Sequence, residues 1–335
     1  MRLPSSGGSS ADGARGSAMI RCQAAPRASR EGRPPRPFLP GARIPATSAG
    51  MHLHLRPCGT LQVHVDCLWY SARGPLPHAR ERFLPTGCAD IVVPLLQDHL
   101  LRYEGEQDAQ VRRLRGAIVQ GPFDRFGVRG TEGASAVVGV HFKPGGAAAF
   151  LGGALPALRT RTELLEDLWG PWARDLRERL QAAASPQQCL RLLQGQLLAR
   201  LGDAPPPDPL AAFAIEAFRC DPAGARVEPV QRASGCTPAQ FIRRFEQAVG
   251  LTPKRFARVQ RLGLLLPQLA SGGTRDWAQI AAAAGYYDQS HLIHEFRKLA
   301  GQTPGAYAPV HPDHPTHVAL GLQAKISNTA APLTA

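Results

Sequence analysis

The sequence predicts an α+β protein in which a β-rich domain with helices of its own precedes an all-α domain. Two runs rich in β-branched residues, at 90–95 and 136–142, are bounded by glycine or proline, which is typical of buried strands. Beyond residue 163, apolar residues recur at three- and four-residue spacing, which places them on one face of a helix. The change of pattern along the chain indicates two folding units.

Shifts in composition divide the chain into five segments. The first is rich in Arg, Pro, Ser and Gly, and it lacks the apolar pattern needed to offset its chain entropy. An organelle transit peptide has a similar composition, but a disordered arm, or a segment upstream of a true start at Met19 or Met51, is favoured. The expected segments are this arm (1–50), a β-rich domain with C-terminal helices, built as a small barrel or sandwich such as a cupin-like barrel (51–202), a stiff Pro-rich linker (203–208), the all-α domain (209–310) and a disordered tail (311–335).

The positive charge of the chain is concentrated in two of these segments. The net charge is +13, with eight arginines against two acids in residues 1–50 and twelve Lys/Arg against seven acids in residues 209–310. A basic all-α domain favours a polyanionic partner, because each cation placed near a phosphate releases counterions. The seven cysteines form no C-x-x-C pair, and no apolar run approaches the ~18 residues of a membrane span. We therefore expect reduced thiols and a cytoplasmic protein with no membrane partner.

The last third contains two short helix pairs, of which the second is the clearer. Asp276 to Gln279 has the form of a capping box, and a short Ala-rich helix after it ends at Gly285. Asp288 then caps a helix over 289–300, whose apolar residues point to one side. Two short helices joined by a Gly turn form a helix-turn-helix unit, whose second helix can enter the major groove. Its exposed side is expected to present Gln289, Ser290, His294, Arg297 and Lys298.

The first helix pair repeats this plan. A helix over 225–233 is followed by a turn and by a second capping box, Thr237 to Gln240, with proline at the first helical position. A connecting helix starts at Lys254 and should end near Leu266, because Pro267 would interrupt it. The exposed side or edge of the first recognition helix is expected to present Ala239, Gln240, Ile242, Arg243 and Arg244.

The all-α segment resembles the DNA-binding domain of AraC/XylS-type transcription regulators. The resemblance lies in the stretches 250–253, 284–292 and 301–304, with Phe296 and Tyr307. It implies two helix-turn-helix units that enter successive major-groove segments on one face of double-stranded DNA. The chain departs from the family at His294, where Arg is common and where a neutral imidazole cannot offer the guanidinium fork. The base- and phosphate-facing positions of the family fall on Ala239, Ile242, Arg243, Gln289, Ser290 and His294.

The β-rich segment resembles an uncharacterised sensor-like domain found ahead of such DNA-binding units. The stretches that carry this resemblance are 84–90, 121–122, 139–146 and 167–170, and no ligand is implied by them. We expect a cytoplasmic, sequence-specific transcription regulator, either activator or repressor. Its partners would be double-stranded DNA, RNA polymerase and a small-molecule effector of the β-rich domain.

The competing hypothesis is an enzyme or a metal-binding cupin-like domain fused to a DNA-binding tail. His52 and His54 form an H-x-H pair, but no Glu follows at the spacing of a metal site. Asp90 beside Cys88 is interpreted as a turn aspartate after Gly87 rather than as a catalytic acid. We therefore expect no catalytic residue, metal or cofactor. Further residues weighed are His64, His78 and His141 as extra metal ligands, His311, His314 and His317 as a tail cluster, and Trp69, Trp169, Trp172 and Phe142 as a pocket lining, for which a place in the core is favoured.

Overall fold

The structure is a computed structural model that describes residues 50–106, 110–202, 204, 206–272, 276–312 and 314–320. These residues all belong to one compact unit of the chain. The arm expected over residues 1–50 lies outside the described residues except for Gly50, and so does the tail beyond residue 320.

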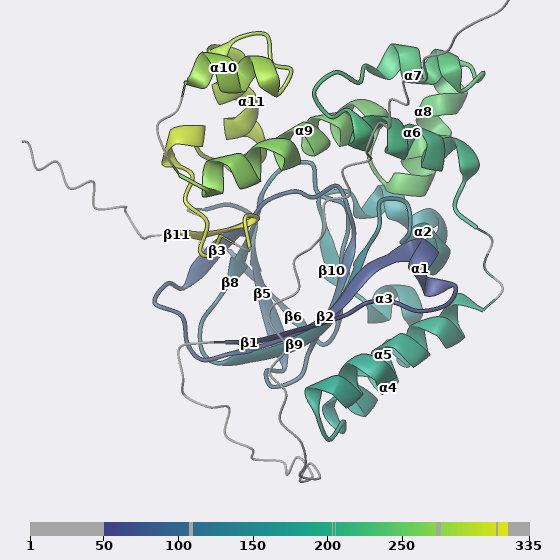
Figure 1. The fold of residues 1–335 in the computed structure, drawn as a ribbon. Coiled ribbons are helices and arrows are strands. Elements are labelled where there is room, and N and C mark those ends of the chain that lie inside the picture. Colours follow the sequence, from purple (N-terminus) through teal and green to yellow (C-terminus); the bar gives the residue numbers. More distant parts are fainter. Residues whose placement is uncertain are drawn as a thin grey trace, which may run out of the picture. The chain divides into compact units, whose positions relative to one another are not determined.

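The domain that the sequence predicted to be β-rich contains two antiparallel sheets (Figure 1). The strand predicted at 90–95 is β4, and the one predicted at 136–142 is β9, at the centre of the first sheet. Sheet A consists, in spatial order, of β1 (Met51–Leu55), β2 (Val65–Arg73), β9 (Ser135–Phe142), β4 (Asp90–Pro94), β7 (Ile118–Gln120) and β10 (Thr162–Leu164). Sheet B consists of β11 (His317–Leu320), β3 (Arg80–Phe83), β8 (Gly127–Gly130), β5 (His99–Tyr103) and β6 (Val111–Arg115).

One face of sheet A carries the main core of this domain. Alternate residues of its central strands, among them Val138 and Val140, are fully buried against helices α4 and α5. Leu176 of α4 and Leu193 of α5 belong to the same cluster, in keeping with the helical spacing seen in the sequence. The helical segments of this domain are α1 (Leu61–His64), α2 (Ala148–Leu151), η1 (Gly152–Leu158), α3 (Glu166–Trp169), α4 (Pro171–Gln181) and α5 (Pro186–Leu201).

The opposite face of sheet A looks toward sheet B and carries both polar and apolar side chains. Arg102 on β5 of sheet B donates to Gln120 on β7 of sheet A at 3.4 Å, which shows that these two faces oppose each other. His141 and Asp90 lie on the same face as Gln120, and each side chain remains partly accessible. The main apolar core therefore lies on the outer side of sheet A, and charged side chains meet apolar ones between the two sheets.

The last third of the chain is helical and has two apolar cores. Phe241, Phe245 and Phe256 centre the first core, and Leu292 and Phe296 centre the second. The expected helices are present, although α7 begins two residues later than predicted. The elements are α6 (Pro209–Cys220), α7 (Val227–Ala233), α8 (Pro238–Val249), α9 (Pro253–Ala270), α10 (Trp277–Ala283), α11 (Gln289–Ala300) and η2 (Pro304–Ala306). No helix of the described residues is both long and apolar enough to cross a membrane.

The predicted end of the connecting helix near Leu266 is wrong, because α9 continues to Ala270 with Pro267 inside it. Pro267 is exposed, so the carbonyl that loses its amide donor faces water. Leu265, Leu266 and Leu269 are buried in the second core around this position. Burial of these side chains offsets the missing hydrogen bond.

The expectation of a disordered tail from residue 311 is also wrong for the part that is described. Residues 317–320 form β11 and pair antiparallel with β3, with His317 opposite Phe83 and Leu320 opposite Arg80. Val318 is 4 % exposed and packs in the second helical core. The tail thus joins the second helix-turn-helix unit to sheet B.

Candidate nucleic-acid interface

The second helix-turn-helix unit consists of α10 and α11. Gly285 between them has a φ of 73°, and a Cβ there would lie 2.1 Å from the carbonyl oxygen of Ala223. The turn therefore requires glycine. Asp288 caps α11 by accepting from the backbone N–H of His291 at 2.7 Å. Asp276 caps α10 through Ala278 and Gln279, but the reciprocal bond of the predicted capping box is not formed there.

The exposed side of α11 carries the side chains predicted for it. Leu292, Phe296 and Leu299 are buried in the second core, which turns the opposite side outward. Lys298 also lies 3.8 Å from a carboxylate oxygen of Glu295. The outward side chains, all exposed, are Gln289, Ser290, His294, Arg297 and Lys298.

Sequence reasoning missed Tyr287, which is the most exposed large hydrophobic residue among those described, at 92 %. It directly precedes the cap of α11, and its backbone N–H lies 3.3 Å from Nδ1 of His291. Its neighbour Tyr286 is buried at 6 % and stacks edge-on against His291. The pair of adjacent tyrosines was the available signal, because two neighbours at a turn cannot both enter one core.

The first recognition helix, α8, begins with a complete capping box. The Thr237 side chain accepts from the N–H of Gln240, whose side chain in turn bonds the backbone of Thr237. Ala239, Ile242 and Arg243 are exposed on the outward side, Ile242 at 42 %. The amide of Gln240 is thus engaged in the cap, while Arg243 has no ion-pair partner among the described residues.

Arg244 is occupied within the protein, although the sequence placed it with the DNA-binding candidates. Its Nε donates to Oδ2 of Asp208 at 3.0 Å, and its Nη2 donates to Oδ1 at 2.8 Å. Asp208 also caps α6 by accepting from the N–H groups of Leu210 and Ala211. Burial would raise the pKa of Asp208, but these hydrogen bonds outweigh it and lower the pKa. The two hydrogen bonds from Arg244 to Asp208 hold α8 against the start of α6.

Helix α9 sets the spacing of the two units because it belongs to both cores. Phe256, near its start, packs edge-on against Phe218 and Phe245 in the first core. Leu262 and Leu265, in its second half, are fully buried in the second core. One continuous helix of 18 residues thus joins α8 to α11.

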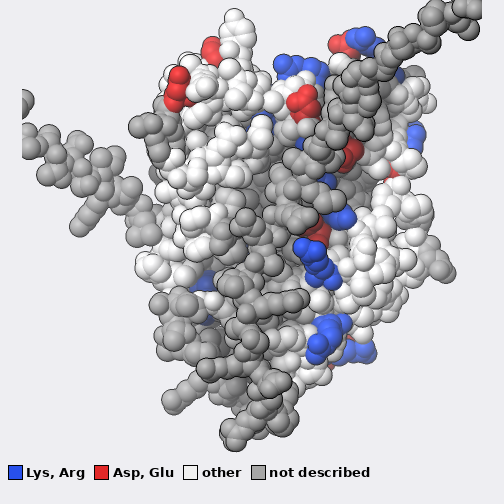
Figure 2. Space-filling model, in the orientation of Figure 1, with Lys and Arg blue, Asp and Glu red and all other residues white. Residues whose placement is uncertain are grey.

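On the face drawn in Figure 2, exposed charge alone does not mark an interface. The Lys and Arg atoms of the described residues on this face are interspersed with Asp and Glu (Figure 2). What singles out α8 and α11 is their exposed donors on helices whose other side is buried, which is the requirement for reading base edges.

The histidines weighed as metal ligands lie in different surroundings. His78 is bonded to Glu81 at 2.7 Å, whereas His64 is buried beside Phe150. His52 stacks on His314, which in turn stacks on His311 and His317, so the tail histidines do lie near one another. Within the described ranges, no three His, Cys, Asp or Glu side chains are arranged to hold a metal ion.

The interpretation of Asp90 as a turn aspartate is wrong. Asp90 is the first residue of β4, and its Oδ1 lies 2.6 Å from Nδ1 of His141 on β9. Burial would lower the pKa of His141, but the carboxylate of Asp90 and the thiol of Cys88 hold that pKa well above its usual value. The register of β4 and β9, which places these residues opposite each other, could not be seen in the sequence.

The aromatic residues weighed as a pocket lining divide between core and partly accessible positions. Phe142 and Trp169 are buried at 0 % and 6 % exposure in the main core. Trp172 packs edge-on against Trp169, and Arg200 lies over both indole rings. Trp69 alone of the four lies on the inner face of sheet A, in line with Cys67 and Ser71 on β2.

Comparison with known proteins gives two domain matches. A helix-turn-helix domain matches residues 231–309, and a domain of unknown function, DUF6597, matches residues 53–163. No curated protein matches the chain significantly.

Solved structures also show similarity to the chain. The DNA-binding domain of AdpA, described as a global transcriptional factor and solved with a target DNA, is 25 % identical over 30 % of this chain and 89 % of its own, with a TM-score of 0.27. The xylose-binding transcription activator XylR is 22 % identical over 36 % of this chain and 37 % of its own, with a TM-score of 0.26. ToxT from Vibrio cholerae is 10 % identical over 72 % of this chain and 96 % of its own, with a TM-score of 0.39.

The helix-turn-helix match covers α8 to α11, the elements whose caps, turns and exposed donors are described above. The chain is a DNA-binding transcription regulator whose helix-turn-helix domain follows a DUF6597 domain.

Proposed function

We propose that α8 and α11 are the two recognition helices and that they read successive major-groove segments of one operator. The observation that carries the proposal is that α9 fixes both helices while each keeps an uncovered side. An Arg forks onto guanine and a Gln onto adenine in the major groove, so Arg243 and Gln289 are the base readers. Ser290 and Arg297 contact phosphates, and His294 supplies a single hydrogen bond.

Two of the residues expected from the sequence to contact DNA have a different role in this proposal. Gln240 caps α8, and Arg244 holds Asp208, so both act by positioning the first recognition helix. Their replacement would weaken binding to every DNA sequence alike, whereas loss of a base reader relaxes the preference at one position.

Selection of bound duplexes from a random DNA pool tests this assignment. The parent protein should select a site with two short preferred segments. Arg243→Ala should lose the preference in one segment and Gln289→Ala in the other, while the exposed control Arg219→Ala on α6 leaves both unchanged. Loss of both preferences together in either variant would contradict separate reading by the two helices.

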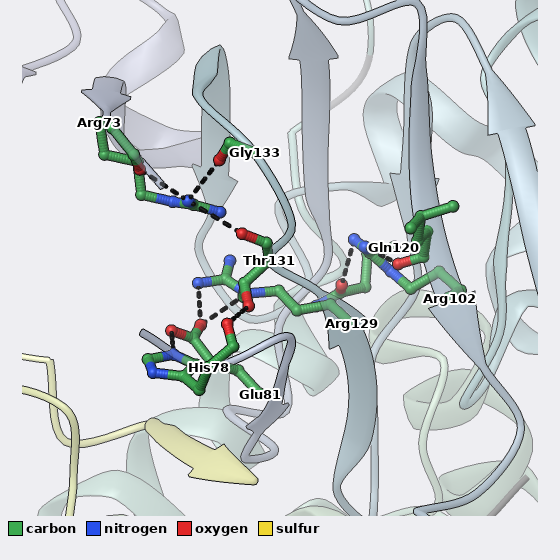
Figure 3. Close-up of polar contacts among 10 residues, drawn as sticks. Arg73, His78, Glu81, Arg102, Gln120, Arg129, Thr131 and Gly133 are labelled. Carbon is green, nitrogen blue, oxygen red and sulfur yellow. Dashed lines mark hydrogen bonds and ion pairs between the residues drawn. The ribbon is translucent and has the colours of Figure 1, made fainter. Parts of the chain in front are cut away.

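We further propose that the space between sheets A and B binds the small-molecule effector. Figure 3 shows Arg73, Arg102 and Arg129 on the facing sides of the two sheets, with Glu81 between Arg129 and His78. Burial and the nearby Arg129 lower the pKa of Arg102 to about 9, and its buried Nε has no hydrogen-bond partner. An unsatisfied donor of this kind is costly without a ligand.

The C-terminal strand connects this space to the DNA-binding domain. His317 and Ala319 on β11 lie opposite Phe83 and Glu81, on the inner side of sheet B, while Val318 packs in the second helical core. An effector that prefers one arrangement of sheet B would thereby bias the second helix-turn-helix unit. RNA polymerase is the further partner we propose for the DNA-bound protein.

A thermal-shift screen tests the effector site. Compounds that raise the melting temperature of the parent should lose their effect in Arg102→Met, whereas the exposed control Arg113→Met on β6 should respond like the parent. Compounds that stabilise both variants equally would place the effector elsewhere.

A further inference from the structure

An open pocket of about 440 Å³ lies where the loop after β7 meets the start of α9 and the last turn of α11. Its lining includes none of Arg102, Arg243 and Gln289, although it shares Lys298 with the exposed side of α11. Its lining residues are Asp124, Arg125, Thr252, Lys254, Arg255, Arg258 and Lys298.

The lining is strongly cationic. Five of its side chains are Lys or Arg, and Asp124 is its single acid. Arg258 donates to Glu295 at 2.6 Å, and the same carboxylate lies 3.8 Å from Lys298. Arg125 and Lys254 are exposed and have no ion pair with any described residue. The pocket therefore keeps an excess of positive charge after its internal pairs are formed.

The backbone adds to this field. Thr252 caps α9 by accepting from the N–H of Arg255 at 3.4 Å, so the amino-terminal end of an 18-residue helix forms one wall. The first N–H groups of a helix and its dipole favour an anion at this end. Together with five cations, this wall forms a site for an anion with more than one charge.

Asp124 already occupies the position of an anion in this pocket. Its side chain is 12 % exposed, forms an ion pair with Arg255 and accepts from Thr160 Oγ1 at 2.8 Å. Burial would raise the pKa of Asp124, but the hydrogen bonds from Thr160 and Arg255 outweigh it and lower the pKa. The carboxylate is thus an ionised internal competitor for Arg255.

We propose that this pocket binds a small phosphorylated molecule with at least two negative charges, which displaces Asp124 from Arg255. Arg125 and Lys254 hold the incoming phosphate from two sides, and the start of α9 donates N–H groups to it. Because Asp124 belongs to the β-rich domain and Arg255 to α9, binding breaks an ion pair that connects the β-rich domain to α9. The pocket is therefore a second regulatory site, independent of the effector proposed between the sheets.

Calorimetric titration of the full chain with inorganic pyrophosphate at constant ionic strength tests the proposal. The parent should bind one pyrophosphate, and Arg125→Met and Lys254→Met should each weaken binding about tenfold or more, since each removes a charged hydrogen-bond donor. The matched control is Arg219→Met, an exposed arginine on α6, which should bind like the parent. Absence of binding, or equal loss in the control, overturns the proposal.

Asp124→Asn should change the affinity for pyrophosphate in the opposite direction. Removing the carboxylate that competes for Arg255 should tighten pyrophosphate binding about tenfold. If pyrophosphate were held only by the general positive charge of the surface, which salt screens, the same substitution would change the affinity little. Thermal unfolding of the same variant shows whether it is folded. Equal or weaker binding in the folded variant contradicts competition.

A final titration in the presence of saturating operator DNA identifies the source of the phosphate. A free phosphorylated ligand should bind the DNA complex as well, with the same dependence on Arg125 and Lys254. If DNA instead displaces pyrophosphate one for one and Arg125→Met weakens DNA binding equally, the pocket holds a backbone phosphate and the small-ligand proposal is wrong.

Discussion

Arg243 on α8 and His294 on α11 both lie six residues after the N-cap of their helix, and both are exposed. A well-placed Arg contributes about 1–3 kcal/mol of discrimination for guanine, whereas a neutral imidazole offers one hydrogen bond per nitrogen. We therefore expect Arg243→Ala to weaken operator binding at least tenfold more than His294→Ala. Operator titrations of the two variants beside the parent check this. Equal losses would mean that the imidazole reads a base.

His294→Arg should strengthen operator binding and steepen its salt dependence. A fixed charge added near the phosphates releases about one further counterion, so the slope of log affinity against log salt should grow by about 0.9. His291→Arg, on an exposed position of the same helix that is turned back toward Tyr286, serves as the matched control. The same slope in both variants would show that the effect is general charge and not position.

The connecting helix α9 differs from the sequence prediction because it continues past Pro267. Pro267 lies on its exposed side and removes one helical hydrogen bond. Restoring that bond should stabilise the protein, although loss of proline also gives the unfolded chain more freedom. We expect Pro267→Ala to raise the free energy of unfolding by about 2 kcal/mol in denaturant titrations. Gln268→Ala, at the next exposed position, should change it by less than about 0.5 kcal/mol; a neutral Pro267→Ala would mean that the helix ends at this point in solution.

Strand β11 makes stability depend on pH through His317. Burial, the nearby Arg129 and, to a lesser extent, His314 and His52 lower the pKa of His317 to about 3, although Glu81 acts in the opposite direction. In the unfolded chain the imidazole titrates near its ordinary value, so the stabilising contribution is present above about pH 6.5 and is lost as the pH falls toward 3.

We therefore expect the parent to lose more stability than His317→Gln between pH 7 and pH 5. Chemical unfolding at the two pH values measures the difference, and the exposed His54→Gln on β1 should follow the parent. Equal loss in the parent and His317→Gln would show that the strand does not bury its histidine.

Across the whole molecule, the features that could be predicted from the sequence are helix caps, turns and single strands, because each of these depends on residues that are close together in the chain. The caps at Thr237 and Asp288 and the turn at Gly285 are local, so the starts of α8 and α11 could be placed from the sequence. The strands β4 and β9 followed from their β-branched runs, but not the pairing that joins Asp90 to His141. Strand β11 has only four residues and a partner far away in the chain, so nothing local distinguished it from a loop.

The same limit applies to the site. The exposed donors of α11 follow from helical periodicity, whereas the capture of Arg244 by Asp208 depends on where the linker returns to α8. The pocket around Asp124 joins segments that are separated by more than 100 residues. Such groupings depend on tertiary structure, which a single sequence pattern does not encode.

Residues 209–310 contain both helical cores except for the contributions of Leu84 and Val318. We expect this fragment to fold and bind operator DNA, but to melt at a lower temperature than the full chain, because two buried side chains are missing from the second core. Circular dichroism and operator titration check both statements. An unfolded fragment would show that the domain boundary at residue 209 is wrong.

The central claim is that two recognition helices, held by one connecting helix, read one operator. Hydroxyl-radical and methylation footprints of the full chain on a selected operator test it most directly. We expect two protected major-groove segments on one face of the DNA, about 10–10.5 base pairs apart, and we expect Arg243→Ala to lose the protection of one segment and keep that of the other. A single protected segment, or two segments that disappear together in that variant, would contradict it.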